Sequence, residues 1–158
     1  MRDIGITWDT VAAEGDWTTP DQDAAYAAQE AAGTVVDGDL VSAVLVSLLT
    51  DRRASTDYAA TTGDNDRRGW WADAYEPEPI GSRLWQLVRL KKVPATLLRA
   101  RDFAGEALAW LIRDGIASRV DVQTFWAGRA ALGIGVRITL TNGPAVAVST
   151  SVPFGLLA

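Results

Sequence analysis

The side chains that most enzymes use for acid–base and nucleophilic chemistry are scarce in this sequence. The chain contains no His and no Cys, which removes the usual base of Ser-His-Asp and Cys-His sites and the ligands of most zinc sites. Three carboxylates do lie close together, Asp73, Glu76 and Glu78, and two carboxylates placed across a cleft can hydrolyse a glycoside. Because these three flank prolines, we expect an exposed loop and no catalytic residue.

A second acidic group, Asp64-Asn65-Asp66 followed by Gly69, has the spacing that opens a calcium-binding loop. Such a loop supplies a bidentate Glu at its twelfth position, and that position holds Tyr75 here. We therefore expect a turn, with no metal and no cofactor.

The densest group of side chains suited to binding lies between residues 66 and 85. It contains three of the seven Trp residues, interleaved with Arg, and these two residue types dominate the hot spots of protein interfaces. Each Trp carries about 150–250 Å² of surface, so three exposed together would exceed the patch that a monomer normally shows to water. The candidates for contact with another protein are Arg67, Arg68, Trp70, Trp71, Asp73, Arg83 and Trp85.

The net charge of −5 is unevenly distributed along the chain. Residues 1–66 hold 13 acidic and 3 basic side chains, whereas residues 67–158 hold 7 acidic and 12 basic ones. The asymmetry is consistent with an ordinary polar face on each half, or with a subunit that docks head to tail through unlike ends. Basic residues beside aromatics can also bind nucleic acid. However, the chain is acidic and lacks a nucleic-acid-binding signature, so we expect protein acceptors instead.

Apolar spacing predicts the helices. Residues 40–50 repeat at helical spacing after Asp39, a suitable N-cap. Ser82 is a suitable cap for a second helix, to about Lys92, and a third should run from about Thr96 to Arg113 with Gly115 as its C-terminal cap. We expect Trp70, Trp71 and Trp85 to pack partly against the first and third helices. In the N-terminal region we expect a short strand at 4–8, a turn at 14–16 and a peripheral Ala-rich helix at about 20–33.

From residue 119 onward the apolar pattern changes to a period of two, which is typical of strands. Strands are expected at 119–126, 132–140 and 145–151, with Asn142-Gly143 as the hairpin between the last two. The predicted fold is therefore α+β: two or three helices packed on a small antiparallel sheet, which is a C-terminal three-stranded meander. We expect a single domain, with residues 1–36 as an N-terminal strand and peripheral segment and residues 37–158 as the α+β body.

Four motifs occur in order: Leu48-Leu49-Thr50-Asp51-Arg52-Arg53, Arg67-Arg68-Gly69-Trp70-Trp71-Ala72-Asp73, Gly81-Ser82-Arg83-Leu84-Trp85 and Glu106-Ala107-Leu108-Ala109-Trp110-Leu111. Through them, over about residues 38–140, the chain resembles the Mu-like phage baseplate protein family. That family is similar to small baseplate-wedge and sheath-initiator proteins of contractile tails and type VI secretion systems. The wider superfamily typically carries Glu-Pro-Arg before its first meander strand, where this chain has Ala117-Ser118-Arg119, so only Arg119 is retained.

The resemblance implies a structural, non-enzymatic virion protein of a contractile phage tail baseplate, of the kind found in Mu-like prophages. Its partners would be other wedge subunits, the sheath protein and, as a further candidate, the tail tube, with no nucleic acid and no membrane. It would be assembled in the host cytoplasm and end in the virion, and the sequence has no signal peptide or membrane span. The alternatives are a phage muralytic hydrolase and a nucleic-acid-binding tail accessory protein.

Three further residues are candidates for contacts within such a baseplate: Arg119, Arg137 and Phe154. Arg137 is the only charged residue from Ala130 to Ala158, so the last two strands carry little to protect an open edge. We expect the sheath protein to add a strand to this hairpin, assisted by the apolar tail 152–158. The alternative is that the tail folds back over the sheet.

Overall fold

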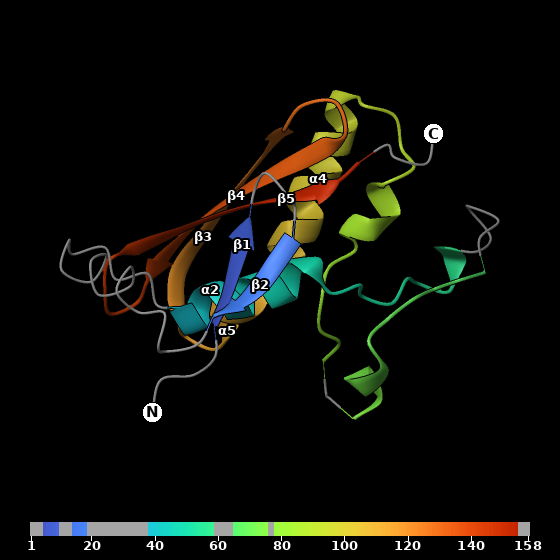
Figure 1. Ribbon diagram of the computed structural model, residues 1–158. Helices are drawn as coiled ribbons and strands as arrows, with labels where there is room; N and C mark the ends of the chain where they lie inside the picture. Colours follow the sequence, from blue (N-terminus) through green and yellow to red (C-terminus); the bar gives the residue numbers. More distant parts are fainter. Residues whose placement is uncertain (1–4, 10–13, 19–37, 59–64, 76–77, 155–158) are drawn as a thin grey trace.

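The computed structural model describes residues 5–9, 14–18, 38–58, 65–75 and 78–154 (Figure 1). Within these ranges the chain forms an α+β fold, as predicted, with a three-stranded antiparallel sheet and three α-helices. None of the helices in these ranges is long and apolar enough to cross a membrane. The predicted Ala-rich helix and the boundary at residues 36 and 37 lie outside the described residues.

The sheet consists of β3 (Ala117–Trp126), β4 (Ala131–Leu140) and β5 (Ala145–Pro153), in that order. Val136 pairs with Val122 on one side and with Val148 on the other. On β4 and β5 the large apolar side chains occupy every second position and are buried or partly buried, because successive side chains of a strand point to opposite faces. The predicted meander is confirmed. Its second turn spans 141–144, and Gly143 does not take the left-handed backbone conformation of a two-residue turn.

The helices are α2 (Gly38–Leu49), α4 (Pro94–Ala107) and α5 (Ala109–Arg113). Asp39 lies in the first turn of α2 rather than before it, so it is not the N-cap that we expected. The predicted third helix is interrupted at Leu108, which separates α4 from α5. Pro94 occupies the first turn of α4, where its missing N–H costs nothing. Gly115 has a φ of 73°, consistent with the predicted cap.

The predicted second helix, from Ser82 to Lys92, is wrong. Only a single turn of 3-10 helix forms there, η3 (Leu84–Leu87), followed by turns. Contacts of three side chains explain the difference. Ser82 is bonded to α2, and Leu84 and Leu87 are both buried in the core. Tertiary contacts therefore override a helical preference that covers less than three turns.

The N-terminal strand is confirmed as β1 (Gly5–Asp9), but the turn predicted at 14–16 is wrong. Those residues belong to β2 (Glu14–Thr18), which pairs with β1 as a separate two-stranded antiparallel sheet. β1 lies beside α2 (Figure 1). The propensity of Glu, Gly and Asp for turns is outweighed here by pairing with the neighbouring strand.

One hydrophobic core joins the helices to the sheet. The buried side chains of β4 and β5 meet α2, α4 and α5, and the core members with at most 1% exposure include Val44, Leu48, Ala104, Leu108, Leu111, Leu132, Ile134, Ile138 and Phe154. The chain between α2 and α4 leaves this two-layer body (green in Figure 1) and returns to it at residues 81–87.

Phe154 is not the exposed interaction residue that we expected. Its side chain is 1% exposed and its ring centroid lies 4.8 Å from that of Trp126, while its N–H donates to the Ala130 carbonyl at 2.8 Å. The chain therefore folds back over the sheet through residue 154, which is the alternative that the sequence left open. A Phe buried in this way contributes several kcal/mol to stability.

Candidate protein-interaction surface

The end of α2 provides the attachment point for the Gly81-Ser82-Arg83-Leu84-Trp85 motif. Ser82 is 2% exposed, and its hydroxyl donates to the Leu48 carbonyl at 2.5 Å, which satisfies one of the open carbonyls at the helix C-terminus. Its backbone N–H donates to the Thr50 carbonyl at 2.9 Å, and its own carbonyl accepts from the Arg52 N–H at 2.9 Å. The segment is thus held to residues 50–52 as a short parallel bridge.

Gly81 makes this close approach possible. Its φ is +100°, and a Cβ at this position would lie 2.4 Å from the Thr50 carbonyl oxygen. No side chain fits there, and the backbone angle is one that L-residues rarely adopt. The motif therefore needs Gly at its first position for a backbone contact with α2, followed by Ser for the bond to the helix end.

The last residue of the motif, Trp85, fixes the other side of the attachment. Its indole N–H donates to the Arg52 carbonyl at 2.9 Å, its ring packs edge-on against Tyr58 at 5.2 Å, and the Arg68 guanidinium lies 4.6 Å from its ring centroid. Trp85 is half-buried, as predicted. Its polar and apolar contacts together hold the two loop segments 52–58 and 65–70 against each other.

A charged group ties the loop to α4. Glu106 accepts a hydrogen bond from Arg83 and lies 3.4 Å from Arg52, and the Arg83 guanidinium also stacks on Phe103 at 4.5 Å. Arg83, predicted to face a partner, therefore has an internal acceptor. The role of Glu106 could not be predicted from the sequence, because no spacing rule relates residues 52, 83 and 106. The only available signal was that Glu106 opens the fourth motif.

The Arg67-Arg68-Gly69-Trp70-Trp71 motif is anchored by its two cations. Arg67 donates through Nε and Nη2 to the Ala54 carbonyl, at 2.9 and 2.6 Å. Arg68 donates to Asp51 at 2.7 Å. Both cations therefore have an acceptor within the chain, and a contact of either with a partner stays a prediction. Gly69, with φ of +111°, packs against Arg53.

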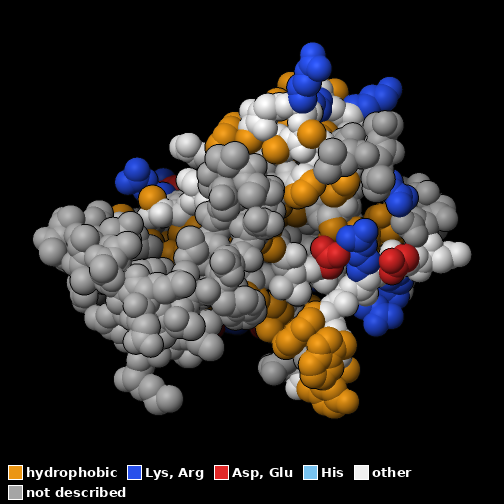
Figure 2. Space-filling view, in the orientation of Figure 1, with side chains coloured by type: hydrophobic (Ala, Val, Ile, Leu, Met, Phe, Trp, Pro, Cys, Tyr) orange, Lys and Arg blue, Asp and Glu red, His pale blue; other side chains and the backbone are white. Residues whose placement is uncertain are grey.

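The two tryptophans of this motif project from the anchored base. Trp70 is 36% exposed and Trp71 is 78% exposed, with their ring centroids 5.8 Å apart, and Tyr75 is 82% exposed. The predicted burial of Trp71 is therefore wrong, whereas Trp70 is partly buried; neither belongs to the side chains that pack on the core between the helices and the sheet. Trp71 opens the 3-10 turn η2 (Trp71–Ala74), and Figure 2 shows hydrophobic side chains gathered at this lower end of the molecule. We call Trp70, Trp71 and Tyr75 the aromatic tip.

The carboxylates considered for catalysis have structural partners. Asp73 Oδ1 accepts from the Ile80 N–H at 3.0 Å, which closes the loop behind the aromatic tip, and Glu78 pairs with Arg113 of α5. Glu76 and Asp64 lie outside the described residues. Within the residues that the structure describes, no group of three or more acidic side chains is arranged to hold a metal ion.

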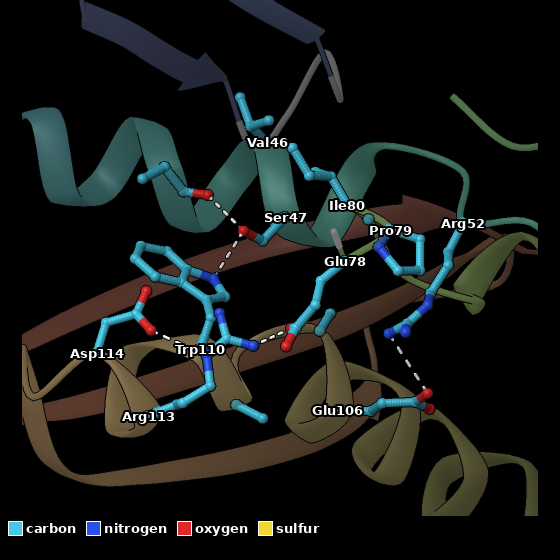
Figure 3. A pocket seen from close by; sticks show the side chains of 14 residues that line it. Val46, Ser47, Arg52, Glu78, Pro79, Ile80, Glu106, Trp110, Arg113 and Asp114 are labelled. Carbon is cyan, nitrogen blue, oxygen red and sulfur yellow. Dashed lines mark hydrogen bonds and ion pairs between the residues drawn. The ribbon is translucent and has the colours of Figure 1, made fainter. Parts of the chain in front are cut away.

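Beside the loop lies a cleft of about 790 Å³ that the sequence analysis did not predict. Figure 3 shows Trp110 of α5 and Val46 of α2 around it, with the Glu78–Arg113 and Arg52–Glu106 pairs at the rim. Trp110 is oriented by a bond from its indole N–H to the Ser47 hydroxyl at 3.1 Å. The charged groups at the rim are thus matched with each other, and the cleft offers an apolar floor rather than a reactive site.

The remaining predicted contact residues lie on the sheet. Arg119 is exposed, and its guanidinium donates twice to the Asp121 carboxylate of the same strand, at 2.9 and 2.6 Å. This hydrogen bond and the charge of Asp121 raise the pKa of Arg119 above its ordinary value, so the side chain stays charged. Arg137 is exposed on β4, opposite Asp121 in the register. Neither lies in the loop that carries the aromatic tip.

Comparisons with known proteins show the family to which the chain belongs. The family described as phage protein GP46 matches residues 40–145, a range that contains all four motifs. The chain is 38% identical over 146 residues to the baseplate protein gp46 of Escherichia phage Mu, covering 92% of each chain. It is 31% identical over 144 residues to the Mu-like prophage FluMu protein gp46 of Haemophilus influenzae, covering 90% of each. The chain belongs to this family of Mu-like phage baseplate proteins.

Proposed function

We propose that this protein is a structural, non-enzymatic subunit of the baseplate of a contractile phage tail, and that it docks on a neighbouring subunit through the aromatic tip. The relationship to the Mu baseplate protein over nearly the whole of both chains supports the baseplate role. The observation that carries the docking role is the exposure of Trp71, at 78%, on a loop that Arg67, Arg68, Ser82 and Trp85 fix by hydrogen bonds within the chain.

The loop is suited to docking because it combines a rigid base with an exposed aromatic side chain. A loop that is already ordered loses little conformational entropy when it binds, so most of the apolar burial contributes to affinity. The ion pairs and backbone bonds at residues 51, 54, 67 and 82 provide that order before any partner arrives. Within the baseplate we place the protein in the wedge, where several subunits must meet in a fixed geometry.

We further propose that β5 receives a strand from the sheath protein and so starts sheath assembly. In the described part of the chain β5 pairs only with β4, which leaves its other edge open. Alternate residues of such an edge point their backbone groups away from the sheet, where a partner strand can bond to them. No charged side chain occurs in β5, although natural edge strands are usually protected by charge.

The docking role is tested by restoring tail assembly in a phage that lacks this gene. Trp71→Ala should lower the yield of contractile tails strongly, because a central Trp of an interface contributes at least about 2 kcal/mol, or about thirtyfold in affinity. Ile112→Ala, which truncates an exposed apolar side chain of α5, serves as the matched control and should restore assembly fully. Wild-type yield from Trp71→Ala would refute the docking role, and normal tails in the absence of the gene would refute the baseplate role.

The competing hydrolase function has a separate readout. Purified protein applied to cell-wall substrate should produce no clearing, because Asp73 and Glu78 are each engaged in a structural contact. Clearing that disappears in an Asp73→Asn variant would overturn the non-enzymatic role while leaving the family membership intact.

A further inference from the structure

A strongly basic surface lies at the opposite end of the molecule from the aromatic tip. The sequence contains no acidic residue between Pro79 and Arg101. Figure 2 shows Lys and Arg side chains projecting at the upper end, over the start of α4, with hydrophobic side chains among them. The exposed cations of this region, which we call the basic face, are Arg89, Lys91, Lys92, Arg99, Arg101 and Arg129.

Backbone and side-chain contacts hold the separate parts of this face together. The Lys92 ammonium donates to the Gly128 carbonyl at 2.7 Å and lies 5.2 Å from the Trp126 ring centroid, so the turn after β3 adjoins the loop before α4. The Thr96 hydroxyl donates to the Lys91 carbonyl at 2.8 Å, which fixes that loop on the first turn of α4. One carboxylate lies at the border, Asp102, at 3.6 Å from Arg101.

The basic face is not simply a solvated polar surface, because it contains exposed apolar side chains. Leu98 is 54% exposed, Val93 43% and Leu90 37%, all within the segment that carries the cations. Exposed apolar side chains surrounded by charge are typical of a surface that another protein covers. The charges then select the partner and orient it, and the apolar groups contribute the burial.

The same chain carries an acidic region that complements this face. Residues 1–37 hold eight acidic side chains and one basic one. We infer that the basic face binds the acidic N-terminal region of a second copy of this chain, in a head-to-tail contact. A nucleic acid is the less suitable occupant, because the net charge of −5 opposes binding to a polyanion. This inference concerns the purified protein and does not depend on the baseplate role.

The first test is the dependence of self-association on salt. In sedimentation velocity at about 0.05 M NaCl the wild type should sediment faster as its concentration rises. The apparent Kd should increase at least about tenfold at about 0.5 M NaCl, where the Debye length falls to a few Å. A wild type that remains monomeric at low salt up to about 100 μM, a range in which weak interfaces are still detected, would overturn the inference.

Matched variants locate the contact. Arg99→Glu with Arg101→Glu should abolish the low-salt association, whereas Arg119→Glu with Arg137→Glu makes the same change in net charge on the exposed sheet and should retain it. Loss of association in both pairs would mean that only net charge matters and would refute a specific contact. Circular dichroism of each variant ensures that the comparison is between folded proteins.

A mixing experiment tests the head-to-tail geometry directly. Asp21→Asn, Asp23→Asn and Glu30→Gln together should also prevent self-association, because they weaken the acidic region and leave the basic face intact. When this variant is mixed with the Arg99→Glu, Arg101→Glu variant, one intact contact remains and a 1:1 complex should form. Absence of that complex overturns the inference. The inference is also overturned if the wild type does not self-associate and binds a labelled single-stranded oligonucleotide more tightly than the Arg99→Glu, Arg101→Glu variant does. That result would assign the basic face to nucleic acid.

Discussion

Two small side chains determine how the loop attaches to the helical layer. Gly81 passes so close to the Thr50 carbonyl that a Cβ would lie 2.4 Å from it, and Ser82 places its hydroxyl on the last turn of α2. Both contacts bury polar backbone groups that would otherwise be unsatisfied at a helix end. The geometry of the aromatic tip thus depends on residues that never touch a partner.

Gly81→Ala should destabilise the protein by at least about 2 kcal/mol, since it combines a strained positive φ with a backbone clash. Gly105→Ala is the matched control. Gly105 lies inside α4 with no atom within 4 Å of a new Cβ, so Ala should stabilise the helix by up to about 1 kcal/mol. Urea unfolding of the two variants decides the point. Equal stability would show that the close approach at Thr50 is not important for the fold.

The tryptophans of the loop should separate into structural and binding residues. Trp85→Ala removes a hydrogen bond and a half-buried ring and should cost about 3 kcal/mol of unfolding free energy. Trp71→Ala removes a side chain that is 78% exposed and should change stability by less than about 0.5 kcal/mol. Thermal melts of both variants test the distinction. If the Trp71→Ala variant has the same lowered melting temperature as the Trp85→Ala variant, the aromatic tip belongs to the core.

The sequence identified the loop whose residues matter, but it predicted the surroundings of those side chains only in part. The Trp–Arg stretch was identifiable because three Trp residues cannot all be solvated, and Trp85 is half-buried as expected. Arg67, Arg68 and Arg83 were named only as candidates for contact with a partner, and their bonds to Ala54, Asp51 and Glu106 were not predicted. Those acceptors are 13, 17 and 23 residues away in the chain, and no local pattern specifies such long-range pairs.

Among the elements, the strands were predicted more accurately than the helices. A period of two over nine residues has few alternatives, so the bounds of β3, β4 and β5 agree with the expectation to within two residues. The segment after Ser82 satisfies a helical pattern over only two turns and forms η3 instead. The strand β2 could not be predicted, because its Glu-Gly-Asp sequence favours a turn until β1 is available for pairing.

The open edge of β5 makes a prediction about sheath assembly. Ala147→Glu with Ser149→Lys places charge on two exposed positions of this strand and should block addition of a further strand. The Ala147→Glu carboxylate lies opposite Arg137 in the register, so the variant should lose little stability. The expected result, seen by electron microscopy of phage lysates, is baseplate-bearing tubes without sheath. Gln123→Lys, on an exposed position of β3 at the opposite edge, should leave sheath formation unchanged. Full-length sheaths on the β5 variant would exclude this edge as the acceptor.

The first residues of the apolar tail belong to the fold, because β5 continues to Pro153 and Phe154 is buried. Since Phe154 is a core residue, deleting 152–158 would remove part of the fold together with any contact surface. The strand-addition proposal therefore depends on β5 itself, and a variant that ends after Phe154 is the appropriate truncation. Burial of an aromatic residue at the end of a strand is difficult to predict, because an apolar terminus has the same composition whether it is covered or free.

On the scale of the whole molecule, three surfaces point in different directions. The aromatic tip lies at the end of the loop, the basic face lies over the start of α4, and the open edge of β5 forms one side of the sheet. A subunit with several unlike surfaces is suited to an assembly in which each copy contacts different neighbours. Family membership and the four motifs identified the class of assembly. The positions of the surfaces required the fold, because they depend on which side chains the core leaves exposed.

The most direct measurement is an electron cryo-microscopy reconstruction of the intact contractile tail that carries this protein. We expect the chain to occupy the baseplate, with Trp71 and Tyr75 covered by a neighbouring subunit and the Arg67–Ala54 and Arg68–Asp51 contacts retained. A baseplate that lacks this chain would contradict the baseplate role, and an aromatic tip that faces solvent there would contradict the docking role.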